Sequence, residues 1–86
     1  MNNKNKIQLK LTKNERLFLC SINYNYRKLF TESTGFSFTG VYEPIFLTIK
    51  ELKVLENFFT SFIVMFPEHE TMSKKIIDRI LLLIYS

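Results

Sequence analysis

Two copies of one short motif constrain the fold of this chain more than any other feature. In each, an apolar run ends in Leu-Thr and a Glu follows three residues later: residues 7–12 with Glu15, and residues 45–48 with Glu51. A threonine hydroxyl accepts a free backbone N–H in the first turn of a helix, while a Glu three positions on accepts the N–H of the threonine itself. Each copy is therefore typical of a strand that leads directly into a capped helix.

The spacing of apolar residues predicts the other elements. Alternation predicts strands over 7–11 and 36–42, and the run at 45–48 predicts a third strand that forms a hairpin with the second. Helical periodicity predicts helices over about 13–30 and 49–66, followed by a loop over 67–71 and a last helix, capped by Ser73, that ends at residue 84. The order β-α-β-β-α-α predicts an α+β fold, a three-stranded sheet packed by two to three helices.

The secondary structure of the last apolar run and the placement of Glu15 both require comment. The apolar run at 80–85 fits a buried strand as well as a helix, and a strand there would give β-α-β-β-α-β, the ferredoxin-like order. We favour the helix. Glu15 falls on the apolar side of the first predicted helix, where its role in the cap is the reason we find for its presence.

Length and composition limit the class of protein. A chain of 86 residues that is 47% hydrophobic predicts one domain, residues 7–86, preceded by a flexible basic arm, residues 1–6. The densest apolar stretches, 58–66 and 80–85, are shorter than the roughly 18–20 residues of a membrane span. A single cysteine, Cys20, excludes an internal disulfide framework. We expect a soluble, cytoplasmic protein without a membrane span.

Charge is concentrated in the first third of the chain. Residues 1–30 hold seven basic residues and one acidic residue, a net charge of +6, whereas residues 31–86 hold five basic and seven acidic residues, a net charge of −2. Such an uneven distribution attracts an anionic partner. The candidate partner-binding residues are Lys4, Lys6, Lys10, Lys13, Arg16, Asn23, Tyr24, Arg27 and Lys28.

Residues that could carry catalysis or bind a metal are few. Cys20 and His69 form the one conceivable nucleophile pair, but no third residue near either would orient them. Glu68, His69 and Glu70 lack the spaced pairs of His or Cys that zinc sites use, and the sequence has no phosphate-binding glycine loop. We therefore expect no enzyme, no catalytic residue, no metal and no cofactor.

Two segments are similar to parts of nucleic-acid-binding proteins. Residues 34–40, with Phe36 and Phe38, resemble the Gly-Phe-x-Phe stretch on which RNA-recognition domains stack bases, although a basic residue is replaced by Thr34. Lys6, Gln8 and Lys10 ahead of a capped helix resemble the ribbon of ribbon-helix-helix proteins, but Gly35, Gly40 and Pro44 interrupt the place of the second helix. These departures are large, so we assign the chain to no family.

The helix over 49–66 has a wide apolar arc: the sheet can cover part of it, and the rest requires the C-terminal segment or another subunit. The wide apolar arcs of this helix and of the last helix predict a homo-oligomer, most simply a dimer. The candidate interface residues are Phe58, Phe62, Phe66, Leu82 and Tyr85. We expect a small non-enzymatic binding or regulatory protein that docks on an acidic surface of a partner protein, as an inhibitor encoded by a mobile genetic element would. The alternative is a protein that binds DNA or RNA through the basic third, and peripheral membrane binding ranks third.

Overall fold

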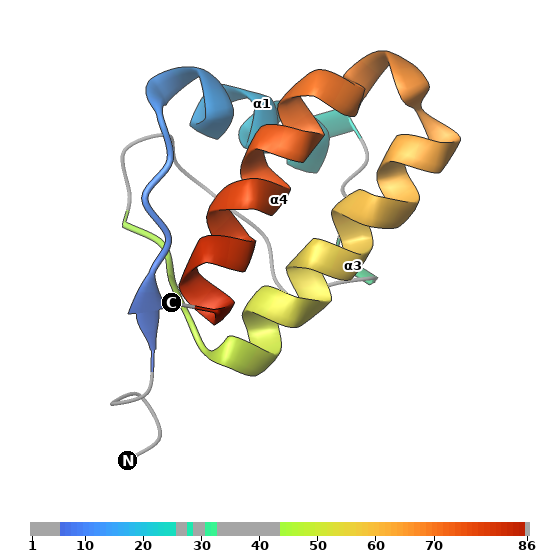
Figure 1. Ribbon diagram of the computed structural model, residues 1–86. Coiled ribbons are helices and arrows are strands. Elements are labelled where there is room, and N and C mark those ends of the chain that lie inside the picture. The colour runs from blue at the N-terminus through green and yellow to red at the C-terminus, as the bar shows by residue number, and fades with distance from the viewer. Residues whose placement is uncertain (1–5, 26–27, 29–30, 33–43, 86) are drawn as a thin grey trace.

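The computed structural model describes residues 6–25, 28, 31–32 and 44–85 of the chain (Figure 1). Two short strands, β1 (Ile7–Gln8) and β2 (Phe46–Leu47), each lead into a helix, α1 (Lys13–Asn25) and α3 (Ile49–Met65). A 3-10 turn, η2 (Pro67–His69), then joins α3 to the last helix, α4 (Glu70–Ile84). The described residues are thus mostly helical, with a small antiparallel sheet.

Both predicted capping boxes are present, and they fix where the first two helices begin. The Oγ1 of Thr12 accepts the N–H of Glu15 at 3.2 Å, and the Oε1 of Glu15 accepts the N–H of Thr12 at 3.0 Å. At the start of α3 the same two bonds join Thr48 and Glu51, at 3.1 and 2.8 Å. Each box satisfies N–H groups that a helix leaves without a partner, so the chain turns from strand to helix directly after Leu-Thr.

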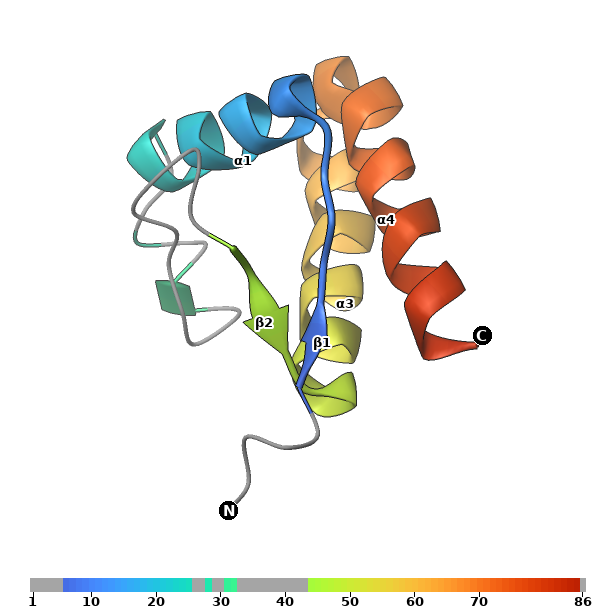
Figure 2. The same ribbon diagram turned by 90° about the vertical axis from the view of Figure 1, so that its left-hand side faces the viewer.

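The two strands pair with each other in antiparallel register, with Ile7 opposite Leu47 and Gln8 opposite Phe46. The ladder continues one residue further, because the N–H of Leu9 donates to the carbonyl of Ile45 at 2.9 Å. Figure 2 shows β1 between β2 and α4, with α3 behind the sheet. The sheet therefore covers the side of the helical hairpin that α3 and α4 form.

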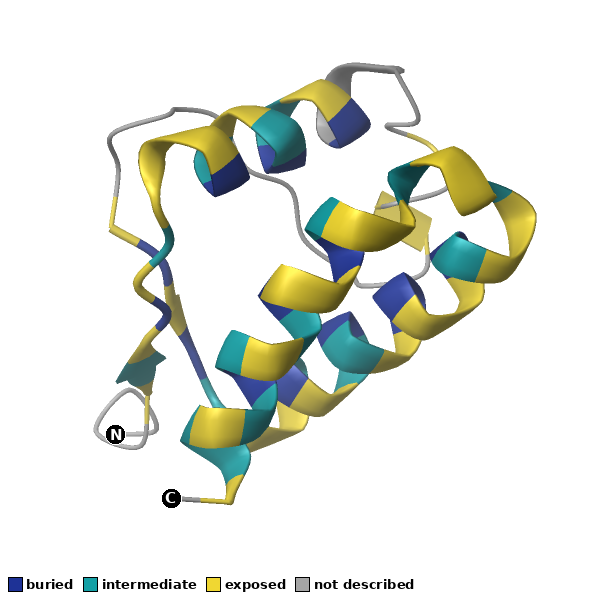
Figure 3. Ribbon diagram, turned by 45° about the horizontal axis from the view of Figure 1, so that its top comes forward, coloured by how far each residue is buried: buried dark blue, intermediate teal, exposed yellow. Residues whose placement is uncertain are grey.

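The core lies where α1, α3, α4 and the inner face of the sheet meet. In Figure 3 the buried segments of the three helices face one another. Helix α3 contributes most, because its wide apolar arc contacts both the sheet and α4. The buried apolar residues are Leu9, Leu19, Ile22, Ile45, Leu47, Leu52, Leu55, Phe58, Phe59, Phe62, Ile76 and Ile80.

The helix over the last apolar run is confirmed, which excludes the ferredoxin-like alternative, but its start was predicted wrongly. Helix α4 begins at Glu70, and residues 67–69 form a 3-10 turn rather than a loop. The turn runs directly into α4, with the N–H of Glu70 donating to the carbonyl of Pro67, so no side-chain cap is required. Ser73, which we predicted as the cap, is instead buried inside the helix.

The three-stranded sheet is not confirmed, since two strands are found among the described residues. The strand predicted over 36–42 lies outside them, together with Phe36 and Phe38. The strand predicted at 45–48 is present as β2, but the partner that the structure gives it is β1. The helix predicted over 13–30 is observed as α1 to Asn25, and most of 26–30 lies outside the described residues.

Candidate binding surface

Glu15 occupies the junction between the first and last helices. Glu15 is 3% exposed, and its Oε1 accepts the N–H of Thr12. The same oxygen forms an ion pair with the Nε of Arg79 from α4, at 2.6 Å. A carboxylate taken out of water at this level requires a compensating positive charge. Arg79 supplies that charge, so the single acidic residue of the first thirty is neutralised from within the molecule.

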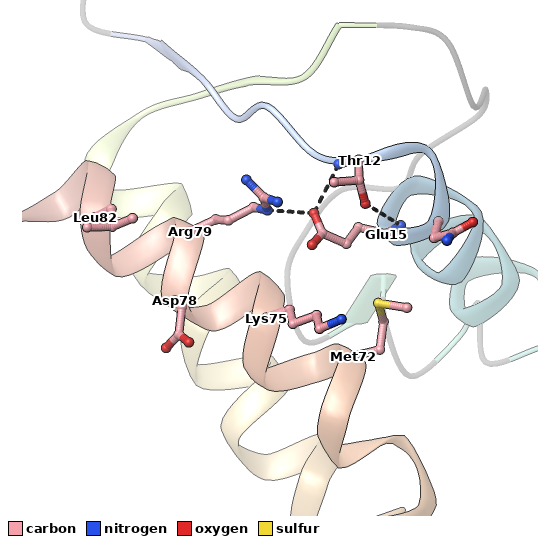
Figure 4. A pocket seen from close by; sticks show the side chains of 8 residues that line it. Thr12, Glu15, Met72, Lys75, Asp78, Arg79 and Leu82 are labelled. Carbon is pink, nitrogen blue, oxygen red and sulfur yellow. Dashed lines mark hydrogen bonds and ion pairs between the residues drawn. The ribbon is translucent and has the colours of Figure 1, made fainter.

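A hollow of about 590 Å³ opens beside this ion pair, between the start of α1 and the outer side of α4. Figure 4 shows Lys75 and Arg79 extending from α4 toward the first turn of α1. Thr12 and Asn14 line the α1 side, and Asp78 contributes a further carboxylate on the α4 side. The hollow is thus a mixed polar site, with charges of both signs on its wall.

A second hollow, of about 320 Å³, continues from the first along β1. The residues that line it are Gln8 at the end of β1, Leu9 and Lys10 directly after it, and Arg79, Leu82 and Leu83 on α4. Leu82 lines both hollows and also a third, apolar one that reaches Tyr85. Leu82 and Tyr85 are 72% and 77% exposed. We call this continuous region, lined by residues of β1, the start of α1 and the outer side of α4, the β1–α4 groove.

Of the predicted basic set, Lys10 lines this groove. Lys6, directly before β1, and Lys13, the first residue of α1, are exposed as well, whereas Arg16 is half-buried. Lys28 is exposed too, beyond the described end of α1. Lys4 and Arg27 lie outside the described residues, as do the side chains of Asn23 and Tyr24.

The lysines of α4 divide into two groups. Lys74 donates to Glu70 at 2.8 Å on the exposed side of the first turns. That hydrogen bond, with the negative charge of Glu70, raises the pKa of Lys74 above its ordinary value. Lys75 lies one residue on and lines the groove instead. Lys75 therefore adds positive charge to the groove, whereas the charge of Lys74 is compensated by Glu70.

The five candidate interface residues separate into core and surface. Phe58 and Phe62 are 5% and 0% exposed within the single chain, and Phe66 is half-buried, with its ring 4.9 Å from that of Phe62. Leu82 and Tyr85 remain exposed. The wide apolar arc of α3 is thus largely covered by α4 and the sheet, and the exposed apolar surface at the interface candidates is that of α4.

The residues considered for catalysis or metal binding have other surroundings. His69 stacks on the ring of Phe62 at 5.6 Å and contacts Phe18 at 5.5 Å, so its imidazole belongs to an aromatic cluster. Cys20 is a partly buried free thiol on α1. Within the described ranges no group of three His, Cys, Asp or Glu side chains is placed to hold a metal ion. None of the helices described there is long and apolar enough to cross a membrane.

The role of Arg79 was missed by the sequence prediction. A signal was present in Glu15, a carboxylate on the apolar side of a helix, because such a group requires a cation as well as a cap. Which cation supplies the charge depends on packing between elements far apart in the sequence.

Comparison with protein-family models, with curated proteins and with solved structures finds no match to this chain.

Proposed function

We propose that this chain is a small non-enzymatic binding protein that docks on an acidic surface of a partner protein through β1 and the start of α1. The observation that supports the proposal is the pairing of Glu15 with Arg79. Because this carboxylate is buried and neutralised by α4, it does not offset the exposed ammonium groups of Lys6, Lys10 and Lys13. Their mutual repulsion in the free protein is relieved when an anionic partner binds.

A protein partner fits the surroundings of these lysines better than a nucleic acid does. The adjoining groove contains the exposed apolar side chains of Leu82 and Tyr85 and the carboxylate of Asp78. Aromatic and apolar residues ringed by polar ones are typical of protein interfaces. A phosphate backbone would gain nothing from the apolar side chains of Leu82 and Tyr85, since its binding depends on positive charge.

The proposal is tested by affinity capture with two variants of equal charge. The double variant Lys10→Glu, Lys13→Glu reverses charge beside the groove, and Lys50→Glu, Lys53→Glu reverses two exposed lysines on α3 as a control. Wild-type protein and the α3 control should retain the same protein from an extract of the organism that encodes the chain, and the first variant should lose it. Retention by both variants would refute the proposed surface.

Nucleic-acid binding is distinguished by fluorescence anisotropy with labelled duplex DNA, single-stranded DNA and RNA. The proposal expects no binding at about 150 mM salt, where phosphate contacts are strongly weakened. Tight binding there, lost in Lys10→Glu, Lys13→Glu and kept in Lys50→Glu, Lys53→Glu, would replace the proposed function with the nucleic-acid alternative.

A further inference from the structure

The register of the sheet determines which backbone groups of β1 face away from β2. Ile7 and Leu9 form the hydrogen-bonded pairs with β2, as the bond from the N–H of Leu9 to Ile45 shows. In an antiparallel ladder the residues between such pairs direct their N–H and C=O groups to the opposite edge. The residue between the two pairs is Gln8, and Lys10 continues the alternation one residue beyond the last pair. Neither has a backbone hydrogen bond to another described residue.

This outer edge of β1 borders the β1–α4 groove. The hollow of about 320 Å³ lies directly between the strand and α4, with Gln8 and Lys10 on one wall and Leu82 on the other. In Figure 2 the side of β1 that is turned away from β2 faces α4. Adjacent strands lie about 4.8 Å apart, so a strand added to this edge would run over the outer side of α4. The edge is thus open where an exposed apolar side chain is also present.

The alternation of buried and exposed residues from Lys6 to Leu11 indicates which side chains an added strand would contact. Ile7, Leu9 and Leu11 face the core side, whereas Lys6, Gln8 and Lys10 are exposed on the outer face. A paired strand places its outer side chains beside Lys6 and Lys10, where opposite charges are favourable. Its inner side chains lie against α4 at Leu82, where apolar groups are favourable.

We propose that the β1–α4 groove binds an extended segment of the partner protein in which acidic and apolar residues alternate, by adding it as a strand to the outer edge of β1. This inference rests on the proposed function and specifies its binding mode. Main-chain hydrogen bonds to Gln8 and Lys10 hold the segment, and the alternating side chains select it. The positive charges of Lys10 and Lys75, which line the groove, and of Lys6, which directly precedes β1, are complementary to the acidic positions.

The probe for this proposal is a phage-displayed library of random dodecapeptides, selected on the immobilised protein. Enriched peptides should carry Asp or Glu at alternate positions with apolar residues between them. The variant Gln8→Pro removes one outward N–H and no bond to β2, because proline is accepted where an edge N–H faces solvent. The matched variant Gln8→Thr keeps the N–H. The enriched peptides should bind Gln8→Thr as they bind wild type, and lose binding to Gln8→Pro.

Amide hydrogen exchange measured by NMR on the wild-type protein gives a second test that requires no variant. On addition of an enriched peptide, exchange at Gln8 and Lys10 should slow by at least about tenfold. Exchange at Leu9 should change little, because its N–H is already bonded to Ile45. Unchanged exchange at Gln8 and Lys10 in the complex would overturn the proposal.

The outcomes separate this inference from the proposed function. Peptides that lose binding to Lys10→Glu, Lys13→Glu but bind Gln8→Pro as well as wild type would refute strand addition and leave the basic docking surface in place. Peptides indifferent to both variants would refute both. No enrichment of alternating acidic and apolar sequences, or a stable dimer whose interface protects Gln8 and Lys10 in the free protein, would refute the groove as a site for a partner segment.

Discussion

The Nε of Arg79 lies 2.6 Å from the Oε1 of Glu15, so that the last helix neutralises the carboxylate that caps the first. One side chain thereby serves two purposes. It satisfies the N–H of Thr12, and it joins α1 to α4 beside the candidate binding groove. The same pairing keeps this acidic group out of reach of a partner that meets Lys10 and Lys13.

Removal of Glu15 should cost more stability than removal of its counterpart in the other capping box. Glu15→Ala deletes the cap and leaves Arg79 without its partner, and we expect a loss of about 2–3 kcal/mol in the free energy of unfolding. Glu51→Ala deletes a cap alone and should cost about 1 kcal/mol. Urea denaturation followed by circular dichroism measures both. Equal losses in the two variants would mean that the Arg79 contact contributes nothing to stability.

Removal of the buried hydroxyl of Ser73 should increase stability, unlike removal of Glu15. Ser73 is fully buried in α4, and its Oγ has no hydrogen-bond partner in the described part of the chain. A buried polar group without a partner costs free energy, and Ala has the higher helix propensity. Ser73→Ala should therefore raise the free energy of unfolding by about 1 kcal/mol. A destabilised variant, measured by thermal denaturation, would show that the hydroxyl is satisfied.

Local signals made much of this fold predictable from the sequence. The two Leu-Thr-x-x-Glu motifs located the starts of α1 and α3, because the bonds of a capping box join residues three apart. The helical end of the chain followed from the spacing of Ile76, Ile77 and Ile80. The start of α4 did not follow, since a 3-10 turn replaces the side-chain cap that sequence reasoning looks for at Ser73.

The candidate site was predictable only in part, because it is assembled from distant elements. The lysines of the first third were identified from charge alone. Lys6, Lys10 and Lys13 are exposed, and Lys10 lines the groove. The opposite wall, formed by Lys75, Arg79 and Leu82, depends on how α4 packs against β1 and α1. The spacing of residues along the sequence does not predict how α4 packs against β1 and α1. Phe62, one of the candidate interface residues, is fully buried within the single chain, where its ring contacts Phe58, Phe66 and His69.

Because Phe62 is buried within the single chain, its removal should lower stability by the same amount at every protein concentration. Phe62→Ala removes a fully buried ring that contacts Phe58, Phe66 and His69, and should cost about 3–5 kcal/mol. Tyr85→Ala, at an exposed ring, should change stability by less than about 0.5 kcal/mol. Denaturation at two protein concentrations checks the result. A cost for Phe62→Ala that grows with protein concentration would instead place this ring in an interface between subunits.

Leu82 should matter for binding and not for folding. Leu82→Asp places a carboxylate beside the groove and should abolish capture of the partner, while the free energy of unfolding changes by less than about 0.5 kcal/mol. Val64→Asp is the matched control, because Val64 is 78% exposed near the end of α3, away from the groove. Binding is compared by affinity capture and stability by thermal denaturation. Equal loss of binding in both variants would contradict a site at Leu82.

The most direct test of the docking surface is the salt dependence of binding to the captured partner, measured by isothermal titration for wild type and for Lys10→Glu, Lys13→Glu. The account predicts that wild-type affinity falls as salt rises from about 50 to 200 mM, since exposed charges are screened in that range. It also predicts that the variant binds at least about tenfold more weakly at low salt, with a flatter dependence. Equal affinities for the two proteins, unchanged by salt, would contradict it.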